Sequence, residues 1–160
     1  MLGDARSIER KVEMRPGERV ICAIHAQDSR DWDRKQASGA TVLVGGFLGS
    51  SIHRKRLERK DATDQPDDLA AFKGTVIVGV TQERVLAVSR GKVLEAPVAA
   101  VRRIDLSQQG GFGKPSAIRL DIDFDDATPR LGLTIETKMA GRKLCRALKE
   151  VAPSVYNPFV

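Results

Sequence analysis

The stretch GTVIVGVTQERVLAVS, residues 74–89, contains two β-branched apolar runs that decide the fold class. Three polar residues separate the runs, and this is the spacing of a β-hairpin. A turn leads from this stretch into VLEAPV, residues 93–98. Because proline cannot donate to a strand ladder, Pro97 predicts an edge strand or the end of a strand. The chain from residue 74 onward is therefore predicted to begin as an antiparallel β structure.

Later segments extend the same pattern. SAIRLDIDF, residues 116–124, alternates apolar and charged side chains, so one face is predicted to be core and the other to face water. VRRIDLSQ at 101–108 and LGLTIET at 131–137 read as strands as well. A Val/Ile-rich run at 19–26 predicts one early strand, after a short helix at 4–14. The sequence thus predicts about seven strands.

The apolar period changes from two to about 3.6 at Thr137, which predicts a C-terminal helix capped by the threonine and ended by Pro153. The helix carries one apolar stripe, Ala140, Leu144, Ala147, Leu148 and Val151. We therefore expect a mainly β (α+β) fold. The expected architecture is an antiparallel barrel of about seven strands, capped by the C-terminal helix and preceded by a short N-terminal helix. At 160 residues the chain is expected to form a single domain, 1–160.

A long segment, at about 27–73, interrupts the predicted strands and is interpreted as an insertion between the first and second strands. It contains a glycine-rich apolar run, TVLVGGFLGSSI at 41–52, followed by HRKRLERK at 53–60. The second run has five cations against Glu58, a net charge of +4. Residues 138–150 likewise carry five cations against one acid, whereas 74–137 balance to zero with eight of each sign. Any anionic partner is expected to meet the two basic segments.

The insertion is the predicted contact region. An apolar run followed by cations suits a segment that enters a membrane surface shallowly and meets anionic head groups. The favoured interpretation is that the same glycines form a flap packed on the barrel or a contact between copies. The candidate partner or membrane contact residues are Phe47, Leu48, Ile52, Arg54, Lys55, Arg56, Arg59 and Lys60.

Nothing in the sequence predicts catalysis, a cofactor or a bound metal. The glycine-rich turn GGFG at 110–113 lacks the spacing of a phosphate-binding loop and reads as a hairpin turn. His25 lies three residues from Cys22 without further ligands, so it is interpreted as a structural histidine. Cys22 and Cys145 are expected to be buried, reduced thiols. We therefore expect a protein that is not an enzyme.

Two short motifs carry a resemblance to a known family. A Pro-Gly-Glu turn, residues 16–18, precedes the early strand, and Thr81 and Arg84 form a Thr-x-x-Arg turn between the next two strands. With the strand pattern and the final helix, the chain resembles bacterial pleckstrin-homology-like (PH-like) domain proteins, in particular uncharacterised actinobacterial members. The resemblance implies a PH-like antiparallel barrel, in which two curled sheets have the C-terminal helix at one open end. It does not imply phosphoinositide binding, because the second strand has no basic residue.

The expected function is a non-catalytic binding or assembly module, acting through protein–protein interaction or self-association. An open edge strand would offer a second contact by strand addition. The alternative is peripheral binding to an anionic membrane surface through 41–52 and 54–60. A third hypothesis, nucleic-acid binding, is disfavoured because the chain has few aromatic residues for base stacking. Since Asp4 and Glu9 interrupt the N-terminal segment, we expect no export signal and a cytoplasmic protein, with the inner membrane face as its peripheral site.

Overall fold

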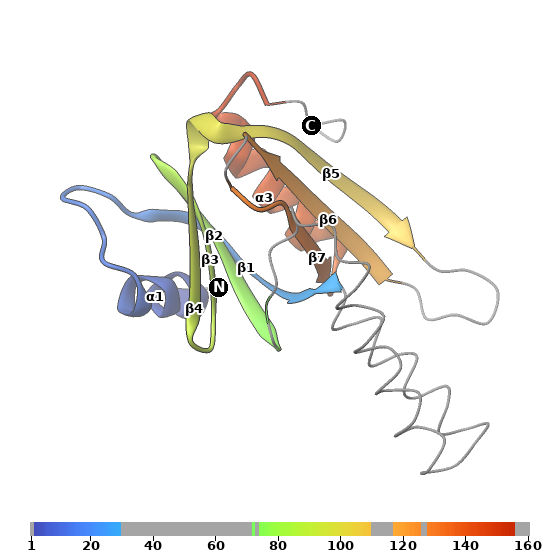
Figure 1. Ribbon diagram of the computed structural model, residues 1–160, viewed down its shortest axis with the longest axis horizontal. Helices are drawn as coiled ribbons and strands as arrows, with labels where there is room; N and C mark the ends of the chain where they lie inside the picture. The colour runs from blue at the N-terminus through green and yellow to red at the C-terminus, as the bar shows by residue number, and fades with distance from the viewer. Residues whose placement is uncertain (1, 30–71, 73, 110–116, 126–127, 156–160) are drawn as a thin grey trace, which may run out of the picture.

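The structure is a computed structural model that describes residues 2–29, 72, 74–109, 117–125 and 128–155. Along the sequence, α1 comes first and α3 last, and seven strands come between these two helices (Figure 1). The elements are α1 (Leu2–Lys11), β1 (Val20–Asp28), β2 (Thr75–Thr81), β3 (Arg84–Ser89), β4 (Lys92–Pro97), the 3₁₀ turn η1 (Val98–Ala100), β5 (Val101–Gln109), β6 (Ala117–Phe124), β7 (Leu131–Ile135) and α3 (Lys138–Val151).

The strands form one antiparallel sheet in the order β4-β3-β2-β1-β7-β6-β5. The seven strands, the early strand among them, are confirmed. The expected barrel is not: β4 and β5 end the strand order, so the sheet stays open within the described residues. β1 joins the two halves. It pairs with β2 along most of its length but with β7 only over Ala26, Gln27 and Asp28.

The main core lies between one face of the sheet and α3. Strand residues at alternate positions, such as Ile24, Val78, Leu120 and Leu133, are buried there together with Leu144 and Leu148 of α3. The predicted apolar stripe of the C-terminal helix therefore faces the core. Both cysteines are buried and reduced, as expected.

A second, smaller core lies on the opposite face of the sheet, beneath α1. Ile8 and Val12 of the helix pack with Leu86 and Val88 of β3. Every residue of β3 is buried because α1 covers one face of the strand and the main core covers the other. This burial explains why its sequence, RVLAVS, runs apolar without alternation.

α3 begins and ends where the sequence predicts. The Thr137 hydroxyl accepts a hydrogen bond from the Ala140 backbone N–H at 3.2 Å, which caps the helix. The helix ends at Val151, before Pro153. No helix among the described residues is long and apolar enough to cross a membrane.

Gly141 allows α3 to approach the sheet closely. A Cβ at this position would lie 2.6 Å from the terminal carbons of both Ile135 and Leu106. We expect Gly141→Ala to lower the free energy of unfolding by about 1 kcal/mol, because overpacking costs about 1–3 kcal/mol and the gain in helix propensity returns about 1 kcal/mol. Urea unfolding measures the change. Ala140→Gly on the same turn loses helix propensity together with a methyl group packed against the core, so it should be destabilising as well. A stabilising Gly141→Ala would contradict the close approach.

Candidate binding surfaces

The contact residues predicted from the sequence, Phe47 to Lys60, lie outside the described residues, and so do the glycine-rich runs at 41–52 and 110–113. The described part of the chain offers four other candidate features: a buried ionic cluster, a pocket, two sheet edges and the solvent face of α3.

The two motifs that carry the family resemblance form one buried cluster. Arg84 donates from Nε to Oε1 of Glu18 at 2.9 Å and from Nη2 to Oε2 at 2.8 Å, a two-pronged ion pair. The Thr81 hydroxyl donates to Oε1 of Glu18 at 2.7 Å and accepts from the Arg84 backbone N–H at 3.0 Å. Gly17, with φ of +78°, gives the turn the left-handed residue that places Glu18 here.

The cluster joins four parts of the chain. Besides Glu18, Arg84 binds the carbonyl of Glu13 at 2.7 Å, just after α1, and the Glu95 carboxylate of β4 at 2.5 Å. The side chain of Glu18 is 0% exposed and that of Arg84 is 7% exposed. Both oxygens of Glu18 and all three guanidinium nitrogens of Arg84 have partners within the protein. The cluster is therefore a structural clamp between the chain after α1, the β2–β3 hairpin and β4.

The electrostatics of the clamp follow from these contacts. The guanidinium of Arg84, with smaller contributions from the Arg15 backbone N–H and Thr81, lowers the pKa of Glu18 to about 2, although burial opposes the shift. The Glu18 carboxylate in turn raises the pKa of Arg84 above its ordinary value. Both groups therefore stay charged throughout the physiological pH range.

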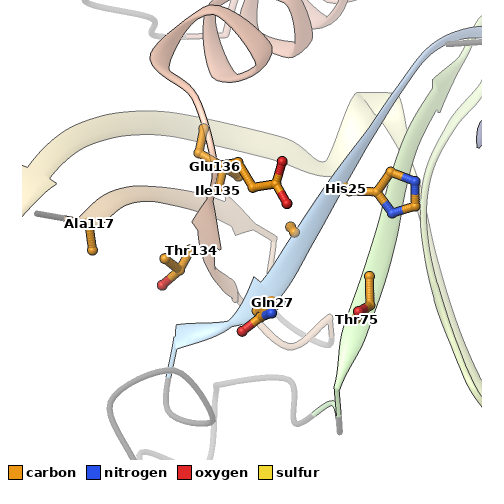
Figure 2. Close-up of a pocket in the computed structure, with 8 residues that line it drawn as sticks. His25, Gln27, Thr75, Ala117, Thr134, Ile135 and Glu136 are labelled. Carbon is orange, nitrogen blue, oxygen red and sulfur yellow. The ribbon is translucent and has the colours of Figure 1, made fainter. Parts of the chain in front are cut away.

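A pocket of about 500 Å³ with a mixed polar and apolar lining opens where β1 meets β7 (Figure 2). This volume lies within the usual range for small-molecule sites. Oε1 of Gln27 is buried there without a hydrogen-bond partner, and the Glu136 carboxylate points toward β1. The lining residues are His25, Ala26, Gln27, Thr75, Ala117, Thr134, Ile135 and Glu136.

Two residues at or near this pocket, His25 and Cys22, are engaged in the structure of the protein. Nε2 of His25 lies 2.6 Å from Oδ1 of Asp4, so the histidine ties β1 to α1, in agreement with its interpretation as a structural residue. Cys22 points into the main core, where burial raises the pKa of its thiol, so it does not pair with His25. The described lining residues offer hydroxyl, amide and carboxylate groups for polar contacts.

The two edges of the sheet differ in how they are protected. β4 has six residues and ends in Pro97, and Lys92 and Glu95 are exposed on it. β5 has nine residues and no proline. Its two arginines are neutralised: Arg102 pairs with Asp125 and Arg103 with Asp105. Short length, proline and charge discourage edge pairing, so β5 is the less protected edge.

No family model, curated protein or solved structure matches the chain.

Proposed function

We propose that this protein is a PH-like, non-catalytic binding or assembly module in which an extended segment of a protein partner, or of a second copy of the chain, adds to the sheet beside β5. The strand order supports the PH-like part: four strands and then three are joined through β1, and a helix follows the last strand.

The length and neutrality of the β5 edge carry the proposal. One side of β5 pairs with β6 from Val101 to Gln109. The other side has no neighbouring strand in the part of the chain that the structure describes. Alternate backbone N–H and C=O groups on that side can pair with an added strand. Ser107 and Gln108 are exposed and uncharged, so no like charges repel an incoming chain there.

Proline substitutions in β5 test the added strand. Successive residues direct their N–H groups to opposite sides, so one of Ser107→Pro and Gln108→Pro removes a bond to β6 and the other affects only the open edge. We expect the better-folded variant, identified by its melting temperature, to lose self-association by at least tenfold in light scattering. The alanine variants at both positions keep the N–H groups and should associate like the wild type.

Photo-cross-linking tests the other case, in which the added strand belongs to a different protein. A photo-cross-linking residue at Gln108 should capture one defined protein in the native host, whereas the same residue at exposed Glu9 of α1 should not. A wild type that stays monomeric at all concentrations and yields no β5-specific cross-link would contradict the proposal.

A further inference from the structure

The solvent face of α3 is a continuous strip of positive charge. Its five cations are Lys138, Arg142, Lys143, Arg146 and Lys149, and the only acid of the helix is Glu150. At 3.6 residues per turn, Met139 and Arg146 lie on the side opposite buried Leu144 and Leu148, with the other cations beside them. The 14-residue helix is about 21 Å long, so the strip is straight and extended.

These cations differ from the arginines of the sheet and its connections, six of which have carboxylate partners: Arg15, Arg84, Arg102, Arg103, Arg119 and Arg130. By contrast, no ion pair involves Lys138, Arg142 or Arg146 among the described residues. Glu150 lies one turn from Arg146 but does not pair with it in the described structure. The charges of Lys138, Arg142 and Arg146 are therefore available to an external anion.

The positive charge at the N-terminal end of α3 also lowers the stability of the helix. The N-terminal end of a helix favours acidic residues, yet the first turn of α3 has no acid and begins with Lys138. Thr137 supplies the cap, so the helix forms in spite of this unfavourable charge. A local departure from the charge rule is expected where a surface serves binding.

One side chain on the strip, Met139, indicates which kind of anionic partner the helix suits. Met139 is 80% exposed and lies among the cations, with Lys138 before it and Arg142 and Lys143 one turn later. An exposed apolar side chain surrounded by cations suits the boundary between phospholipid head groups and acyl chains. A phosphate backbone of nucleic acid gives such a side chain no apolar partner, and the helix has no aromatic residue for base stacking.

We propose that the solvent face of α3 binds an anionic phospholipid surface, with the helix lying parallel to it and Met139 entering the head-group layer. This site is distinct from the predicted insertion contact at 41–60 and does not depend on the added strand at β5. The cations supply electrostatic attraction, and binding should weaken as salt is raised.

Vesicle co-sedimentation with the full chain tests this proposal. The wild type should bind vesicles of phosphatidylglycerol and phosphatidylcholine and fail to bind phosphatidylcholine alone. The variant K138E/R142E/R146E should bind the anionic vesicles at least about 100-fold more weakly, since each lost cation contributes about a factor of five and each new carboxylate adds repulsion. Met139→Ser should weaken binding several-fold while leaving its salt dependence unchanged.

A control variant with the same change in net charge separates the effect of cations on α3 from the effect of net charge alone. R6E/R10E/K11E reverses three exposed cations of α1, far along the chain from α3, and should retain most of the binding. Equal losses in the two triple variants would overturn the proposal in favour of a net-charge effect. Unchanged binding in the α3 variant, with both proteins folded by circular dichroism, would also overturn it. A wild type that binds duplex DNA through α3 but not anionic vesicles would replace the lipid surface by nucleic acid.

Discussion

The Arg84→Met variant is expected to lose about 3–5 kcal/mol of unfolding free energy, because the substitution leaves the Glu18 carboxylate buried without its cation. Arg84 holds both oxygens of Glu18 and also reaches Glu95 and the carbonyl of Glu13. Removing it therefore releases the chain after α1, the β2–β3 hairpin and β4 from one another. Urea unfolding at neutral pH, followed by circular dichroism, measures the loss.

Two further variants separate the buried pair from arginine replacement in general. Arg102→Met removes an ion pair whose arginine is 72% exposed, and it should change stability by less than about 1 kcal/mol. Combining Arg84→Met with Glu18→Met removes both charges, and the double variant should be more stable than Arg84→Met alone. If Arg84→Met costs no more than Arg102→Met, the clamp does not have the structural role assigned to it.

The elements of this fold could be predicted from the sequence because each strand has a local signature. Alternation located β6, the β-branched runs located β2 and β3, and the change of period at Thr137 located α3. Pro97 predicted an edge strand or a strand end, and both are found: β4 is an outer strand of the sheet, and it ends at Pro97. The openness of the sheet could not be predicted in the same way, because strand patterns do not say whether the first and last strands of the order meet.

The surfaces were harder to predict than the elements. The resemblance pointed to Glu18, Thr81 and Arg84, but the ion pair joins residues 66 positions apart, and no local pattern indicates that contact. The pairing of His25 with Asp4 likewise depends on where α1 packs. The basic character of α3 is visible in the sequence, yet the absence of carboxylate partners at Lys138, Arg142 and Arg146 among the described residues emerges only from the structure.

Acid is expected to destabilise the protein through Glu18. Its pKa is about 2 in the folded protein against an ordinary value of 4.5. As the pH falls, the unfolded chain takes up the proton first, so the stabilisation is complete above about pH 4.5 and is lost progressively toward pH 2. The difference, 4.5 minus 2, corresponds to about 3 kcal/mol at neutral pH, because each pKa unit is equivalent to about 1.4 kcal/mol.

Glu18→Gln tests this pH dependence directly, because the amide keeps the shape of the side chain and cannot titrate. The variant should be less stable than the wild type at pH 6 by about 3 kcal/mol, and the gap should narrow between pH 4.5 and pH 2. Urea unfolding at several pH values in this window gives the two curves. Glu9→Gln, at an exposed position of α1, should run parallel to the wild type throughout. A gap between Glu18→Gln and wild type that stays constant down to pH 2 would show that the carboxylate charge does not stabilise the clamp, and that the loss at neutral pH comes from packing around the amide.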